Sequence, residues 1–195
     1  FHTLTSCRSL ASNISNLHNL TTYSSLGSNI SLFHINRARI LRRLGLGGRA
    51  VKAARSALAL EADNAEIYCE LAGALLDIEN SAEALTAAKY AYQLAPDMTE
   101  VCKNLAIAHF QVGQSNQIIK KYKLAEEHYR AAVKFTPNFI EALVNLGNVL
   151  RLLYRLEEAQ ECYEDAITLN SDVPEIYGNM GVVIQEQGAT KRAIE

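Results

Sequence analysis

The stretch from Ile140 to Val173 reads IEALVNLGNVLRLLYRLEEAQECYEDAITLNSDV and contains two helical patterns of apolar residues, over about 141–153 and 156–169. Small residues occur where two such helices would have to touch: Gly147, Ala159 and Ala166. A small residue at a crossing lets one backbone approach the other, and larger side chains fill the space on either side. The stretch therefore predicts a closely packed pair of antiparallel helices.

The same pattern recurs along the chain at a period of thirty-four residues. Residues separated by this period are of the same type: Gly147 and Gly181, Asn145 and Asn179, Ala159 and Ala193. Paired helices at this period are typical of tetratricopeptide (TPR) repeats. The stretch resembles a TPR unit at the family's key positions, which are Leu143, Leu146, Gly147, Leu150, Ala159, Tyr163 and Ala166. We therefore predict an all-α fold, a right-handed α-solenoid of TPR helix hairpins.

The alignment divides the chain into four full units and one partial unit. Their expected ranges are 31–64, 65–98, 99–139, 140–173 and 174–195. Residues 1–30 are rich in Ser, Thr, Asn and Leu and fit the repeat poorly, so we expect weak order or one capping helix there. The chain starts at Phe1, and Glu195 falls within the second helix of the partial unit. We therefore expect a fragment of a longer array.

The third unit is seven residues longer than the others. Equivalent alanines and prolines of units two and three are forty-one residues apart: Ala84 and Ala125, Pro96 and Pro137. A helix lengthened by seven residues, nearly two turns, keeps its buried face within about 20°. An apolar stripe continues through the added segment at Ile118, Tyr122, Ala125 and Tyr129. It favours an early start of the second helix, and a loop is the alternative.

The net charge of -2 hides a strong asymmetry along the chain. Residues 1–60 carry eight basic and no acidic side chains, whereas residues 61–195 carry eleven basic and twenty-one acidic ones. A basic segment can contact nucleic acid or an acidic partner. No nucleic-acid-binding motif accompanies it, so we expect a solvated face and no nucleic-acid partner. No apolar run is long enough for a membrane span, and we expect no membrane partner.

No constellation of residues points to catalysis or metal binding. The sequence has no glycine-rich phosphate loop, no His-Glu-x-x-His and no Cys-x-x-Cys. His109 and His128 lie on expected repeat helices, where we expect surface or packing roles. The four cysteines have no paired spacing and are interpreted as small buried hydrophobes of a reducing compartment. We therefore expect no catalytic residue, no metal, no cofactor and a cytoplasmic or nuclear protein.

The first helices of the units are expected to line the concave side of the solenoid, with equivalent residues in a row. One position in this row reads Asn36, Glu70, Asn104, Asn145 and Asn179. Each amide offers a donor and an acceptor that match the backbone of an extended peptide. We predict that these asparagines bind extended protein segments and that Lys103 and Asn148, which flank the row, tune the preference. Asparagine is also common at this place in TPR units of every function.

The asparagine row resembles the TPR arms of nucleocytoplasmic protein O-glycosyltransferases. The segment PNFIEALVNLGNVL from Pro137 resembles units of O-GlcNAc transferase. The segment KNLAIAHFQVG, followed by eleven residues before Ala125, resembles the extended repeat of the SPINDLY family of O-fucosyltransferases. The segments IYCELAGALL and IYGNMGVVIQEQG resemble further units of that family. The resemblance covers residues 31–195 and implies a substrate-binding arm, with the catalytic domain beyond Glu195.

Two functions therefore remain open. The first is the recognition arm of an enzyme that transfers fucose or N-acetylglucosamine to Ser/Thr, and its partners would be extended Ser/Thr-rich protein segments. The second is a non-enzymatic TPR scaffold or adaptor in a multiprotein assembly. Self-association through the solenoid is compatible with both. If the row binds such segments, replacing Asn104, Asn145 and Asn179 together by Ala is expected to weaken the binding.

Overall fold

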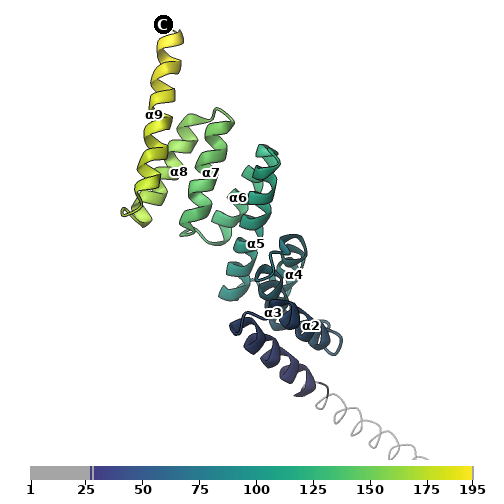
Figure 1. The fold of residues 1–195 in the computed structure, drawn as a ribbon. Coiled ribbons are helices and arrows are strands. Elements are labelled where there is room, and N and C mark those ends of the chain that lie inside the picture. Colours follow the sequence, from purple (N-terminus) through teal and green to yellow (C-terminus); the bar gives the residue numbers. More distant parts are fainter. Residues whose placement is uncertain (1–26, 28, 195) are drawn as a thin grey trace, which may run out of the picture.

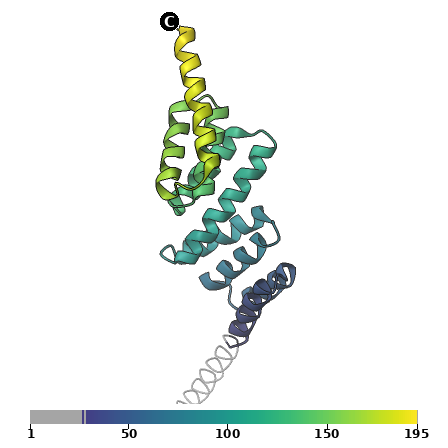
Figure 2. The same ribbon diagram turned by 60° about the vertical axis from the view of Figure 1, so that its left-hand side comes forward.

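The computed structural model describes residue 27 and residues 29–194, with side chains through residue 189. Figures 1 and 2 show an elongated array of antiparallel helix pairs, with α9 at one end. A helix over residues 29–43 is followed by α2 (Gly47–Leu58), α3 (Ala65–Leu76), α4 (Ser81–Leu94), α5 (Thr99–Ile118), α6 (Tyr122–Phe135), α7 (Ile140–Leu152), α8 (Leu156–Leu169) and α9 (Pro174–Ile194). The described elements are all helices, which confirms the predicted all-α solenoid. None of them is long and apolar enough to cross a membrane.

Each first helix of a hairpin packs against its own second helix and against neighbouring hairpins. The first helices also contact one another, α3 with α5 and α7 with α9. No comparable contact joins α4 to α6 or α6 to α8 among the described helices. The contacts between α3 and α5 and between α7 and α9 place these first helices on the inner side of the array.

The turns inside the hairpins share one backbone geometry. Four turn residues have a positive φ: Gly45, Glu79, Lys120 and Tyr154. At each of them the last turn of the first helix closes with the same two bonds; at the third turn, for example, Lys120 donates to the Gln117 carbonyl and Lys121 to the Asn116 carbonyl. This pattern satisfies carbonyl groups that a helix end leaves without partners. Only Gly45 is a glycine, the residue that adopts this conformation without steric strain.

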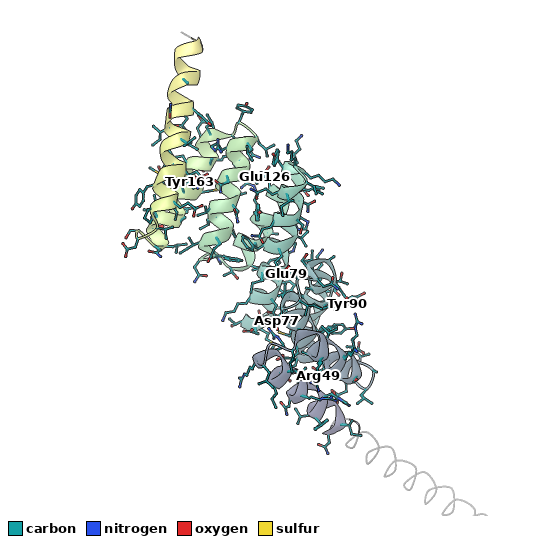
Figure 3. The ribbon with its side chains drawn as sticks, in the orientation of Figure 1. Arg49, Asp77, Glu79, Tyr90, Glu126 and Tyr163 are labelled. Atoms are coloured by element: carbon teal, nitrogen blue, oxygen red, sulfur yellow. The ribbon has the colours of Figure 1, made fainter. Side chains whose placement is uncertain are left out.

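A glycine in the first helix and a tyrosine in the second close two of the hairpins. A Cβ atom on Gly113 would lie 2.7 Å from Tyr129 Cε1, and one on Gly147 would lie 2.7 Å from Tyr163 Cε1. Both tyrosine rings are fully buried. Tyr163, labelled in Figure 3, also donates a hydrogen bond of 2.8 Å from its hydroxyl to Asn148 Oδ1. The ring therefore has no free space to move into.

The seven added residues of the third unit lengthen its first helix. Helix α5 has 20 residues, whereas α6 has 14 and begins only at Tyr122. The expected early start of the second helix is therefore wrong, and so is the alternative loop. The reason lies in the packing: Gly113 meets Tyr129 as Gly147 meets Tyr163, so the thirty-four-residue period has already resumed at Gly113. The extra turns lie before that glycine, in an unbroken helix.

Helix α5 joins two hydrophobic clusters. Leu105 and Ala108 belong to a cluster formed with the helices before α5. Phe110 packs against the other cluster, formed by α6 to α9. Its ring centroid lies 4.9 Å from that of Phe139 and 5.8 Å from that of Tyr129. The N-terminal and C-terminal blocks of the array thus meet along this one helix, as Figure 1 shows.

Helix α9 continues past the point where a turn was expected. By analogy with α7, the first helix of the fifth unit should end near residue 186, with Ala193 in a second helix. Instead α9 runs through Gly188 to Ile194. No second helix packs against it within the described residues to enforce the turn. The capping helix expected in residues 1–30 lies almost entirely outside the described residues.

The glycine–tyrosine contact makes a testable prediction about stability. Gly147→Ala places a methyl group against the immobile Tyr163 ring and is expected to lower the free energy of unfolding by about 1–3 kcal/mol. Gly181 occupies the equivalent position one period later, where a Cβ would meet nothing within 4 Å. Gly181→Ala is therefore expected to raise the free energy of unfolding by about 0.5–1 kcal/mol through helix propensity. Urea denaturation of both variants would measure this, and equal effects would contradict the contact.

Candidate functional site

Ion pairs fill the inner face at the N-terminal end of the array. Arg39 Nε donates to Glu70 Oε1 at 2.7 Å, and its Nη2 donates to Glu66. Arg42 Nε donates to Asp77 Oδ2 at 2.8 Å; Asp77 is labelled in Figure 3. Hydrogen bonds to Glu70 and Glu66 raise the pKa of Arg39 above its ordinary value. Glu70, which interrupts the asparagine row, is thus paired with arginines of the helix over residues 29–43.

Asn104 does not face the concave surface. It is only 3% exposed, and its Nδ2 donates to the Cys69 carbonyl oxygen at 3.0 Å and lies 3.3 Å from Cys69 Sγ. The prediction that Asn104 binds a peptide is therefore wrong. Its amide instead links α5 to the backbone of α3. Burial raises the pKa of the Cys69 thiol to about 11, which keeps that side chain neutral.

The other predicted site residues are spread along the array. Asn36 and Lys103 are exposed. Asn145 and Asn179 are half-buried on the inner helices α7 and α9. Asn148 is also half-buried, and its carbonyl oxygen accepts from Tyr163, so only its NH₂ group remains for a ligand. Of the predicted site residues, Asn145 lines the inner hollows of the described array. It contributes to two of these hollows, which meet at its side chain.

Three hollows form a continuous strip along α5, α7 and α9, which we call the inner groove. The middle hollow has a volume of about 570 Å³ and lies between α5 and α7. It shares Gln114 and Ile118 with a hollow of about 270 Å³ beside the turn between α3 and α4. It shares Asn145 with a hollow of about 290 Å³ beside α9. Helices α5 and α7 do not pack closely against each other within the described residues, whereas α7 and α9 are in contact.

Glutamines in the C-terminal part of α5 form the other half of the groove, and the sequence interpretation missed them. The groove is lined by Gln111, Gln114 and Gln117. A signal for two of them was present: once the alignment follows Gly113 to Gly147, Gln111 falls on Asn145 and Gln114 on Asn148. The forty-one-residue offset, taken from alanines and prolines, concealed this equivalence.

The amide groups of the groove differ in how they are occupied. Gln117 Oε1 accepts a 2.7 Å hydrogen bond from the Tyr129 hydroxyl. Gln111 Oε1 is buried and has no hydrogen-bond partner within the described residues. A buried acceptor without a partner costs free energy until water or a ligand supplies a donor. The groove can therefore receive N–H groups, and it has the donors to bind C=O groups in return.

His109 and His128 form a packed pair between α5 and α6. Their Nδ1 atoms are 3.0 Å apart, and the His109 ring stacks on Phe135 with centroids 6.0 Å apart. Burial, the neighbouring His128 and Lys89 lower the pKa of His109 to about 4. Burial and Lys89 also lower the pKa of His128. The described residues contain no cluster of three or more side chains that could hold a metal ion.

The histidine pair makes stability depend on pH. The folded chain favours the neutral imidazoles, so the unfolded chain, with an ordinary pKa of 6.5, takes up protons first as the pH falls. We expect the histidine pair to make its full contribution to the free energy of unfolding above pH 6.5. The free energy of unfolding is expected to decrease as the pH falls toward 4. His109→Gln removes the more strongly shifted group and is expected to flatten this slope. Urea denaturation across that pH range would test this, and an unchanged slope in the variant would contradict it.

Comparisons with known proteins agree with this architecture. A family model described as "Tetratricopeptide repeat" matches residues 35–99, and one described as "TPR repeat" matches residues 147–188. No curated protein matches the chain significantly.

Solved structures share the fold. A crystal structure of MamA protein is 20% identical, covers 86% of this chain and 87% of its own, and has a TM-score of 0.65. MamA 41-end from Desulfovibrio magneticus RS-1 is 21% identical over 85% of this chain and 89% of its own, with a TM-score of 0.62. At this identity the similarity shows the fold alone. The two family models together match more than half of the residues, and the chain therefore contains tetratricopeptide repeats.

Proposed function

We propose that this chain is a non-enzymatic TPR scaffold whose inner groove binds an extended protein segment. The observation that carries the proposal is the continuity of the three hollows, joined through Gln114, Ile118 and Asn145. A groove along successive inner helices suits an unfolded chain better than a compact small molecule, because its hollows are open and arranged in a line. Protein binding is the role that the TPR architecture favours.

The chemistry of the groove favours backbone recognition. Asparagine and glutamine amides each offer donors and an acceptor, and one amide can pair with both the C=O and the N–H of a peptide unit. Ile118 and Leu152 add apolar surface beside these amides. Such a site holds an extended segment with little dependence on its side chains, and Ser or Thr hydroxyls fit it as additional donors and acceptors. We therefore propose Ser/Thr-rich segments as the first class of ligand.

The scaffold interpretation has more support than the glycosyltransferase arm. The matching family models describe TPR repeats, and the similar structures reported above are of MamA, so none of these descriptions names a glycosyltransferase. The asparagine row that suggested such an arm is incomplete, because Asn104 does not face the concave surface and Glu70 stands in place of an asparagine. The glycosyltransferase arm rests on the sequence resemblance and requires a sugar-nucleotide-binding domain in the same polypeptide.

A cytoplasmic or nuclear location is part of the proposal. Cys69, Cys102 and Cys162 are all free thiols, and Cys69 and Cys162 are buried. Free cysteines packed as apolar side chains suit a reducing compartment. Fractionation of cells that express the tagged protein would test this location.

A double substitution in the groove tests the proposed function. Gln114→Ala with Asn145→Ala removes two amides without touching the buried core, since Gln114 is exposed and Asn145 half-buried. We expect it to weaken binding of a fluorescein-labelled, unstructured Ser/Thr-rich peptide by about tenfold, because each lost hydrogen bond contributes about 0.5–1.5 kcal/mol. Fluorescence anisotropy would measure the affinity.

The matched control is Asn36→Ala, which removes the same kind of amide from an exposed inner position outside the groove. It is expected to leave the affinity unchanged. Equal losses in the control and the double variant, or no loss in the double variant, would reject the inner groove as the binding site.

A further inference from the structure

We propose that one edge of the array is a second docking surface, which binds an acidic protein segment that carries apolar side chains. The surface lies on the turn between α5 and α6 and the neighbouring turn between α7 and α8. We call it the turn patch, and its exposed residues are Ile118, Ile119, Lys120, Lys121, Lys123 and Tyr154.

Large apolar side chains of the turn patch are open to solvent. Tyr154 is 87% exposed, Ile118 is 80% exposed and Ile119 is 59% exposed. The two turns adjoin, since residues 120–124 of one and Leu153 of the other line a common hollow of about 370 Å³. Clustered apolar side chains at an exposed edge are typical of surfaces that another molecule covers.

The lysines of the turn patch are not paired with carboxylates of the described chain. Residues 101–125 contain four lysines and no acidic residue, and the next carboxylates along the chain are those of Glu126 and Glu127 on α6. None of the three patch lysines forms an ion pair with a described residue. The adjoining turn differs, because Arg155 there pairs with Glu126 and Glu158. A partner that offers carboxylates would supply the missing charge, which commits the proposal to an acidic segment.

The turns of the patch share the backbone geometry of the other hairpin turns. Lys120 has φ 59° and Tyr154 has φ 58°, the left-handed conformation that glycine adopts at the equivalent Gly45. Glu79 shares this conformation with φ 59°, so it belongs to the common geometry of these hairpin turns, which close with the same pair of backbone bonds. The lysine and the tyrosine project from the tips of their turns, where a partner can reach them without disturbing the helices.

The turn patch is separable from the inner groove. Ile119, Lys121, Lys123 and Tyr154 line none of the three hollows that form the groove. Substitutions at these four positions therefore test the patch alone, and the proposed function can fail or hold independently.

Charge reversal is the decisive experiment. The probe is a fluorescein-labelled synthetic peptide in which Asp and Glu alternate with Leu and Phe, titrated with the full chain by fluorescence anisotropy. Lys121→Glu with Lys123→Glu is expected to weaken binding about tenfold, and added salt is expected to weaken wild-type binding. Carboxylates near the start of α6 favour the helix, so the melting temperature of this variant should be equal or higher.

Two further variants separate charge from apolar contact. Tyr154→Ser is expected to weaken binding several-fold, and a probe with Ser in place of Leu and Phe is expected to bind more weakly than the original. Lys52→Glu with Lys134→Glu is the control of equal charge, since both lysines are exposed away from the patch. It is expected to leave the affinity unchanged.

Several outcomes would overturn the proposal. They are an absence of probe binding, equal affinity of the Lys121→Glu/Lys123→Glu variant, and an equal loss in the control. Vesicles of phosphatidylserine and phosphatidylcholine form a separate arm, and wild-type binding to them without probe binding would assign the patch to a membrane surface. Salt-sensitive dimerisation of the wild type in sedimentation velocity, lost in the variant, would assign it to a second copy. Either assignment replaces the proposed partner.

Discussion

Helix α5 packs against the preceding hairpin and against its own second helix at different points along its length. The rest of the array depends on how it makes both contacts. Near its start, α5 fits the preceding hairpin through Leu105 and the amide of Asn104. Nearer its end it fits its own second helix through Gly113. The registers differ by seven residues, about 10 Å along the axis. Because seven residues are nearly two turns, both contacts lie on compatible faces.

This displacement divides the inner face into two parts with different chemistry. On the N-terminal side, Arg39 and Arg42 pair with the carboxylates of α3 and of Asp77, and a hollow of about 410 Å³ there is lined by charged side chains. On the C-terminal side, α7 is set apart from α5, and the space between them is lined by amides and a few apolar groups. The α5–α6 turn, with its lysines, adjoins the α7–α8 turn at the edge of the array.

The solenoid was predictable from sequence because its signal is local and repeated: glycine and alanine recur wherever two helices cross. The site was less predictable. Helical periodicity is the same whether seven residues are added to the first helix or to the second, and only the contact of Gly113 with Tyr129 decides between them. Likewise, the burial of Asn104 depends on how closely α3 approaches α5. Asn145 was identified because α7 keeps the regular period, and the glutamines of α5 were missed because that helix does not.

A helix with two registers also restricts how its gene can change in length. One residue added between Ala106 and Gly113 would turn every later helix by about 100° relative to every earlier one. Both buried faces could not then be kept. Insertions and deletions in this segment are tolerable only in steps close to whole turns, whereas the exposed turns between helices can accept single residues. Related sequences should therefore differ in the length of α5 by whole helical turns and in the length of the exposed turns by single residues.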